Sequence, residues 1–242
     1  MAGTMQTSPT ASRGRLDTAL TAVGALLAAA LILALGAGKF SFHHTTGSAG
    51  MGSGVAAEQT RSVPRFTRLN LAGDNNVIVQ VGTGQSIVVH GDRNLLDRVT
   101  TRVRSGTLEI GTTAGNFNAR SPMYVSISVP SLDDVALEGA GNIAVTGIDT
   151  QSLTVELPGS GNIEATGTAG KLDVTVGGEG TVTLRGLVAR DARAELAGNG
   201  TILLTATHSL TASLSGSGTI FYSGNPPHLT QRVTGSGTIT AR

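Results

Sequence analysis

The sequence contains no cysteine and no tryptophan, and only 3% of its 242 residues are aromatic. Without cysteine the chain has no disulfide, no thiolate nucleophile and no cysteine-ligated zinc or iron–sulfur site. So few aromatic side chains are poor material for stacking on sugars or on single-stranded nucleic acid. Charged residues make up 14% of the chain and its formal net charge is +1, so no basic stripe indicates nucleic acid. We therefore expect no nucleic-acid partner and no cofactor.

One long uncharged stretch occupies residues 18–38. A helix of that length rises about 1.5 Å per residue and covers the roughly 30 Å hydrocarbon core of a bilayer. Arg13 and Arg15 precede the stretch and Lys39 follows it, which predicts a cytoplasmic N-terminal tail. Small residues at its end also suit cleavage by a signal peptidase. The stretch is therefore either a signal anchor in the membrane or a signal peptide, and both predict export.

These features divide the chain into four parts. Residues 1–17 form the cytoplasmic tail, and residues 18–38 form the transmembrane or signal helix. Residues 39–63 are rich in Gly, Ser, Thr and Ala and lack apolar periodicity, which is typical of a flexible linker. The remaining domain, residues 64–242, is expected to be extracytoplasmic, either in the periplasm or at the cell surface.

Glycine is abundant, with 34 residues, and in the second half of the chain it is periodic. A heptad that centres on Gly-x-Gly and ends in Asn or Thr followed by Ile or Val returns six times: LEGAGNI (137–143), LPGSGNI (157–163), VGGEGTV (176–182), LAGNGTI (196–202), LSGSGTI (214–220) and VTGSGTI (233–239). The spacing is 18 to 20 residues, with an average of about 19. A fixed period of this kind predicts stacked units that bury a continuous core between neighbours.

Apolar residues alternate with polar ones inside each unit, which predicts strands rather than helices. When the units are aligned, one apolar column reads Ile143, Ile163, Val182, Ile202, Ile220 and Ile239, and the column before it reads Asn142, Asn162, Thr181, Thr201, Thr219 and Thr238. The first becomes an internal ladder if coils stack about 4.8 Å apart, and the second can form ladders of side-chain hydrogen bonds. We predict an all-β fold, a right-handed parallel β-helix (single-stranded solenoid) with coils of about 19 residues. A β-sandwich of short hairpins is the structural alternative.

The paired glycines are predicted to form the corners between strands, where a positive φ is cheap only without a Cβ atom. They are Gly139, Gly141, Gly159, Gly161, Gly178, Gly180, Gly198, Gly200, Gly216, Gly218, Gly235 and Gly237.

Residues 64–130 are less regular. The segment 68–82 is similar to a degenerate coil with Asn76 near its corner, and the segment 94–103 is predicted to be a short helix that caps the N-terminal end. The final coil shows no cap of its own, and an open strand edge favours pairing with another chain. We therefore expect self-association through the end of the β-helix.

The Gly-Ser-Gly-Asn-Ile and Gly-Ser-Gly-Thr-Ile repeats, with the upstream segments LNLAGDNNVIVQVG, NLLDRVTTRVRSGTLEIG and YVSISVPSLDDVALEGAGNI, resemble the head GIN domain family of autotransporter adhesin heads. The resemblance covers residues 64–242. It implies an extracytoplasmic β-helical domain that is adhesin-like or associated with the cell envelope, and it supplies no catalytic residue.

The residues themselves give little support for catalysis or metal binding. The stretch 177–185 approaches a calcium-binding nonapeptide, but Val182 stands where that motif needs a carboxylate. His43 and His44 have no further ligand nearby in sequence. We expect no metal site and no catalytic residues, and hence a binding or structural module that is not an enzyme.

The alternative function is a polysaccharide-acting β-helix enzyme, a lyase or a hydrolase. Its candidate carboxylates are Asp133, Asp134, Glu138 and Glu156, because glycoside cleavage needs two carboxyl groups roughly 5–10 Å apart. For the binding function, the outward column beside the Ile ladder brings Leu203 and Phe221 onto adjacent coils. We predict a small apolar contact patch there, unless the segment 223–229 folds over it. Its partner would be a protein or a surface glycan.

Overall fold

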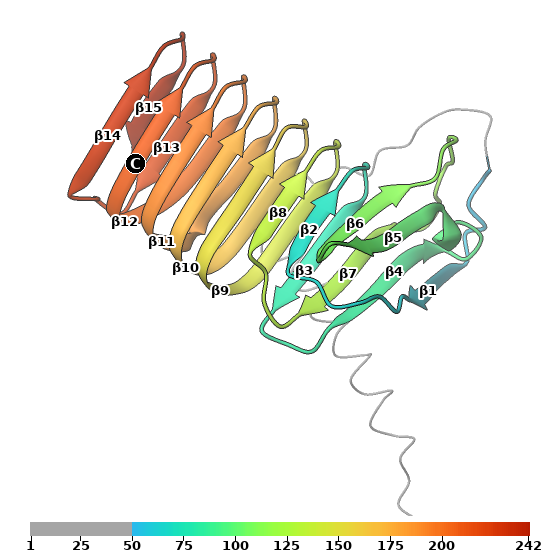
Figure 1. Cartoon of the computed structure of the whole chain (residues 1–242). Helices are drawn as coiled ribbons and strands as arrows, with labels where there is room; N and C mark the ends of the chain where they lie inside the picture. Colours follow the sequence, from blue (N-terminus) through green and yellow to red (C-terminus); the bar gives the residue numbers. More distant parts are fainter. Residues whose placement is uncertain (1–49) are drawn as a thin grey trace, which may run out of the picture. The chain divides into compact units, whose positions relative to one another are not determined.

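The computed structural model describes residues 50–242, and their secondary structure is almost entirely β-strand (Figure 1). The expected N-terminal helix lies outside the described residues. Within the described part, no helix has the length and apolar character needed to cross a membrane.

The strands of the first half are short. They are β1 (Ala56–Thr60), β2 (Arg68–Leu71), β3 (Asn76–Val81), β4 (Ser86–Asp92), β5 (Val99–Arg104), β6 (Thr107–Thr112), β7 (Tyr124–Val129) and β8 (Asp134–Leu137), with one 3₁₀ turn, η1 (Leu96–Arg98), before β5. The repeat region forms longer strands that bend round the coil. They are β9 (Asn142–Leu157), β10 (Asn162–Val176), β11 (Thr181–Leu196), β12 (Thr201–Leu214), β13 (Thr219–Ser223), β14 (His228–Val233) and β15 (Thr238–Ala241).

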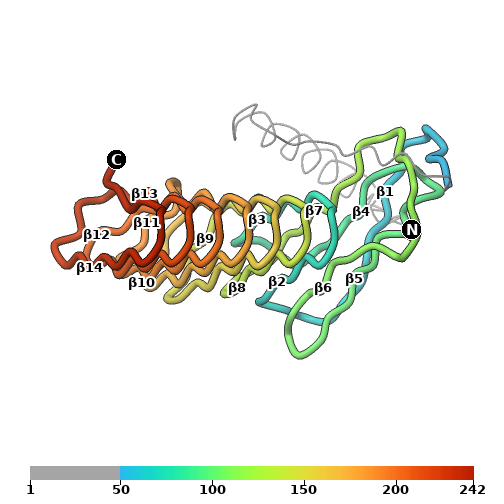
Figure 2. Tube along the Cα trace, turned by 90° about the horizontal axis from the view of Figure 1, so that it is seen from above, coloured from blue at the N-terminus to red at the C-terminus, as the bar shows by residue number. Residues whose placement is uncertain are grey.

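The repeat units stack in parallel and in register, as the column alignment predicts. Ile143 pairs with Ile163, Ile163 with Val182, and the same column continues through Ile202, Ile220 and Ile239. The first five members of this ladder are at most 1% exposed. Figure 2 shows the coils following one another along the stack. The predicted parallel solenoid is confirmed, and the β-sandwich alternative is wrong.

The corner glycines lie between the strands, but the reason predicted for them is wrong. None of the twelve is among the glycines with positive φ. A Cβ atom on Gly161 would instead overlap the carbonyl oxygen of Gly141 in the preceding coil and lie 2.6 Å from a methyl group of Leu137. The other corner glycines meet the preceding coil in the same way. Close stacking of the backbone, and not a left-handed conformation, therefore requires glycine at these corners.

In the first part of the domain, the order of strands in the stack differs from their order in the sequence. β3 lies between β7 and β9, and β2 lies between β6 and β8. The early coil at residues 68–82 is thus flanked on both sides by later residues, which the sequence pattern did not indicate. Beyond it, β4 pairs antiparallel with β7, and β1 pairs antiparallel with β4. These two antiparallel strands continue the β3–β7 side of the sheet at this end of the stack.

Two predictions for the N-terminal part are wrong. The segment 94–103 is not a capping helix, because it forms only η1 and then β5, which makes a hairpin with β6. Ser105 and Gly106 both have positive φ (48° and 78°) and form the two-residue turn that such a hairpin favours. The linker predicted for residues 39–63 is also too long. β1 already belongs to the sheet, so the folded domain begins before residue 64.

Candidate functional site

The solenoid presents two outward surfaces of different chemistry. The hydroxyl face is formed by outward side chains at the start of each coil, and it consists of Asn142, Asn162, Glu164, Thr181, Thr183, Thr201, Leu203, Thr219 and Phe221. The charged face is formed by outward side chains of the returning half-coils, and it includes Arg68, Asp134, Glu156, Lys171, Asp173, Asp191, Arg193 and Glu195. Because coil stacking fixes the register, each face is a regular array.

A ladder of asparagine amides holds the first coils of the hydroxyl face. Asn162 donates a hydrogen bond to Asn142, and Asn142 donates one to Asn76, each at 2.8 Å. The predicted ladder is confirmed for the asparagines and extends to Asn76 in the early coil. Threonine continues the column in the next coils, and its β-branched side chain is restricted in χ1. The column is therefore polar along its whole length.

The predicted apolar patch lies on this face. Leu203 and Phe221 are opposite each other on β12 and β13, and both are half-buried. The guanidinium group of Arg242 lies 4.0 Å from the centre of the Phe221 ring, which is a favourable cation–π contact. Glu164 lies two coils before Leu203 in the same column, and burial raises the pKa of its carboxyl. The patch thus joins an apolar surface to a cation.

Charges of opposite sign lie side by side at two places on the charged face. Asp173 lies beside Arg193, and Lys171 lies beside Asp191. The ion pair of Arg193, however, is with Glu195 on the same strand. Such exposed pairs contribute about 0–1 kcal/mol each, so this face adds little to stability.

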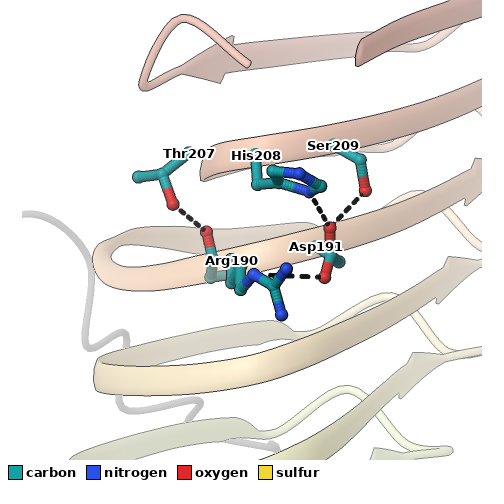
Figure 3. A network of polar contacts seen from close by, with 6 residues as sticks. Arg190, Asp191, Thr207, His208 and Ser209 are labelled. Atoms are coloured by element: carbon teal, nitrogen blue, oxygen red, sulfur yellow. Dashed lines mark hydrogen bonds and ion pairs between the residues drawn. The ribbon is translucent and has the colours of Figure 1, made fainter. Parts of the chain in front are cut away.

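A denser polar cluster surrounds Asp191 where β11 and β12 bend (Figure 3). Its carboxylate accepts hydrogen bonds from Ser209 at 2.6 Å and from His208 at 2.7 Å, and Arg190 lies 3.9 Å away. The Ser209 and His208 hydrogen bonds hold the pKa of Asp191 below its ordinary value, against a smaller effect of burial and with help from Arg190. Serine and histidine both donate to the same acid here. The cluster therefore lacks the serine-to-histidine contact that a nucleophile needs.

A different trio does have that contact. The Nε2 atom of His90 lies 2.7 Å from the Ser126 hydroxyl, and its Nδ1 atom lies 3.2 Å from a carboxylate oxygen of Glu58. The imidazole stacks on Tyr124 with ring centroids 4.2 Å apart. Burial lowers the pKa of His90 below its ordinary value, although Glu58 opposes the shift. This is the order of nucleophile, base and orienting acid found in serine hydrolases.

The backbone around Ser126 does not fit that chemistry. β7 pairs with β3 on one edge and with β4 on the other, so its N–H groups are committed to the sheet. Acyl transfer needs free donors that point at the developing oxyanion. The trio is better explained as a polar contact that ties β1, β4 and β7 together. Antiparallel pairing of distant strands brings the three residues together, and no sequence motif signals it.

The candidate carboxylates of the enzyme alternative are partly assembled. Asp134 lies opposite Thr154, which places it diagonally from Glu156 on the charged face. Burial, with smaller contributions from Glu156 and Asp133, raises the pKa of Asp134. Asp133 accepts a hydrogen bond from Thr150, and Glu138 accepts one from Asn70. Two of the four candidate acids, Asp133 and Glu138, therefore make hydrogen bonds inside the domain.

One fully buried acid was missed by sequence reasoning. Asp92 is 0% exposed, and its carboxylate accepts hydrogen bonds from the backbone N–H groups of Gly54, Arg120 and Ser121 and from the Ser121 hydroxyl. Burial alone would raise its pKa, but these donors outweigh burial and hold the pKa below its ordinary value. Asp92 is thus an internal anchor between the 50–55 segment, β4 and the 118–121 loop.

Among residues 50–242, no group of three or more His, Asp or Glu side chains is placed to hold a metal ion. The histidines His43 and His44 lie outside the described residues.

Comparison with known proteins gives one family. The sequence model of the family described as "Putative auto-transporter adhesin, head GIN domain" matches residues 65–226. A crystal structure of a "putative adhesin" from Bacteroides fragilis is similar, with a TM-score of 0.66 and 24% identity over 79% of this chain and 99% of that one. At that identity the likeness shows the fold.

Two further structures, both from Parabacteroides distasonis, match less closely. One is a "Putative lipid binding protein", with a TM-score of 0.47 and 22% identity over 79% of this chain and 98% of that one. The other is a "putative adhesin", with a TM-score of 0.48 and 19% identity over 80% of this chain and 99% of that one. No curated protein matches the chain.

Proposed function

Because the chain belongs to the head GIN domain family, we propose that it is a non-enzymatic, adhesin-like binding module that works outside the cytoplasm. The family's description and the fold shared with the B. fragilis structure support an adhesin-like role. The stretch at residues 18–38 supports export, either as a membrane anchor or as a signal peptide.

The hydroxyl face carries the proposal, with the Leu203–Phe221 patch near its C-terminal end. Its threonines and asparagines repeat at the coil spacing of about 4.8 Å, so an extended partner meets the same groups several times. Many weak contacts made together give avidity that no single contact supplies. The partner is a protein or a surface glycan, since both can offer an apolar surface beside hydroxyl or amide groups.

A glycan array and a panel of immobilised bacterial and host surface proteins, probed with the full chain, test the binding role. Phe221→Asp should weaken any binding at least ten-fold, because it places a charge in the patch. The matched control is Thr211→Asp. Thr211 belongs to β12, like Leu203, but it lies on the charged face, on the opposite side of the coil. Equal loss in both variants, or no loss in either, would contradict the hydroxyl face as the contact surface.

The enzyme alternative rests on the Asp134–Glu156 neighbourhood. A lyase and hydrolase screen against acidic and neutral polysaccharides tests it, with Asp134→Asn as the variant. Turnover that disappears in Asp134→Asn would overturn the non-enzymatic proposal. Labelling of Ser126 by a fluorophosphonate probe would overturn it as well.

A further inference from the structure

The last described coil has an edge that no other described strand covers. Among residues 50–242, β14 pairs only with β12, and β15 pairs only with β13 (Figure 1). Leu229 and Val233 are 42% and 46% exposed, whereas Leu210 and Leu214, their partners in the preceding coil, are 1% exposed. The apolar interior of the stack is therefore open at this end.

The C-terminal end of a second copy of this chain matches the open edge formed by β14 and β15. The opposite end of the described stack is built differently, because β4 and β1 run antiparallel to their neighbours there. Head-to-tail stacking would thus join unlike ends. Two like ends related by a two-fold axis bury the same strands on both copies and form a closed dimer.

The alternation of side chains restricts the register of such a pairing. Related by a two-fold axis, the two copies of β14 run antiparallel, and residues directly opposite each other then point to the same side of the sheet. Leu229, Gln231 and Val233 continue the inward columns of Leu210, Ala212 and Leu214. A register centred on Gln231 places Leu229 opposite Val233 of the second copy, and Gln231 opposite itself.

The outward side chains of β14 are compatible with the register centred on Gln231. Thr230 lies opposite Arg232 of the second copy, so the two arginines do not face each other. Like charges directly opposite each other would destabilise the pair, and this register avoids that contact.

In β15, on the other side of the coil, the same two-fold axis passes through Thr240. Around Thr240, the inward residues Ile239 and Ala241 lie opposite each other in the two copies. Gln231 lies four residues before Gly235, and Thr240 lies four residues after Ser236, so both centres are equally far from the middle of the corner. A single two-fold axis therefore serves both strands.

Gln231 itself points to a partner. It continues a column whose earlier members are Val155, Val174, Ala194 and Ala212, all of them small, apolar and buried. An amide has a donor and an acceptor, so two glutamines related by a two-fold axis satisfy each other. A buried polar residue of this kind can fix the register of an assembly at some cost in stability. We propose that two copies of this chain associate end to end through β14 and β15, with the Gln231 side chains paired across the axis.

Cysteine cross-linking tests the register directly, because the native chain contains no cysteine. Residues directly opposite each other in antiparallel strands have Cα atoms about 4.5–5.5 Å apart, within the range that a disulfide spans. Gln231→Cys should therefore form a disulfide-linked dimer under mild oxidation. The matched control is Thr230→Cys, whose copies are offset by two residues and lie roughly 8 Å apart, too far for a disulfide.

The expected result is at least ten-fold more cross-linked dimer for Gln231→Cys than for Thr230→Cys. A second measurement is the mass of the full chain in solution by light scattering, which should be twice the 24.4 kDa of one chain. Val233→Lys should return the mass to that of one chain, while Thr211→Lys leaves the dimer intact. Equal cross-linking of the two cysteine variants, or a native chain that stays monomeric at about 100 μM, would overturn the proposal. If Val233→Lys does not fold, the comparison of Gln231→Cys with Thr230→Cys still tests the proposed dimer.

Discussion

Adjacent glycines at one corner allow the role of backbone stacking to be measured. Gly177 and Gly178 follow β10, but their surroundings differ. A Cβ atom on Gly177 would meet only the Cα atom of Pro158, at an ordinary 3.9 Å. A Cβ atom on Gly178 would overlap the carbonyl oxygen of Gly159 and lie 2.8 Å from its carbonyl carbon and 2.9 Å from the carbonyl oxygen of Pro158. The change to alanine should therefore destabilise the fold at Gly178 only.

The size of the effect follows from these contacts. Unstrained carbon atoms approach to about 3.5–4.0 Å, so the corner of Gly178→Ala must lift by roughly 1 Å from the coil below it. Nothing flexible can yield, because the atoms in the way are backbone. Lifting also weakens the hydrogen bonds that Gly177 and Gly178 donate to Leu157. Overpacking and the weakened bonds together cost about 2–4 kcal/mol. Gly177→Ala should change stability by less than about 1 kcal/mol, toward stabilisation, because alanine restricts the unfolded chain.

Thermal unfolding followed by circular dichroism compares the two variants. A domain of this size loses about 2–4 °C in Tm for each kcal/mol, so Gly178→Ala should melt roughly 5–15 °C below the native chain. Gly177→Ala should melt within about 3 °C of it. If both variants melt at the same temperature, the corner glycines are not required by coil stacking, and the explanation given for the repeat is wrong.

Two further predictions concern buried titratable groups and are tested by unfolding at different pH values. Asp92→Asn should lower stability by about 3 kcal/mol or more at pH 7, because it removes a charged acceptor from buried N–H donors. Since the folded pKa of Asp92 is depressed, this stabilisation is present above its unfolded pKa of about 3.9 and is lost as the pH falls through the folded pKa. A variant whose deficit persists undiminished at the lowest pH would contradict this. The folded pKa of His90, which faces Glu58, Ser126 and Tyr124, is also lowered, so the unfolded chain binds more protons below about pH 6.5. Stability should fall as the pH drops from 7 to 5, and less so in His90→Gln; equal slopes would refute the assignment.

The stacked core could be predicted from the sequence because the repeat carries its own register. Once equivalent residues of the repeats are aligned, Ile163 must lie between Ile143 and Val182. Each inward side chain then packs against its equivalents in the two neighbouring coils. The cause of the corner glycines could not be predicted in the same way. A glycine needed for positive φ and one needed for close approach look identical in sequence, and only the spacing of neighbouring backbones separates them.

The first half of the domain shows where pattern reasoning fails. Residues 64–130 lack the repeat, so nothing in the sequence indicates that β3 enters the stack between β7 and β9. The turn at Asp92 predicts a short helix over residues 94–103, but the β-branched residues of this segment and the Ser105–Gly106 turn favour the hairpin that forms. Asp92 and the Glu58–His90–Ser126 trio are likewise products of antiparallel pairing between distant strands. Their functions in the fold become visible only when those strands are placed.

The repeat also explains why the proposed contact residues stand out. Inward positions must repeat, because each side chain packs on the coils above and below it, whereas the fold places no such demand on the outward positions. An apolar side chain at an outward position, such as Leu203 or Phe221 in a column that also holds Glu164 and Thr183, is therefore not explained by packing inside the stack. The same logic applies in reverse to Gln231, since a polar side chain breaks a column in which stacking favours an apolar one. Departures of both kinds fall in the last coils of the described stack, and this is where contacts with a partner and with a second copy are proposed.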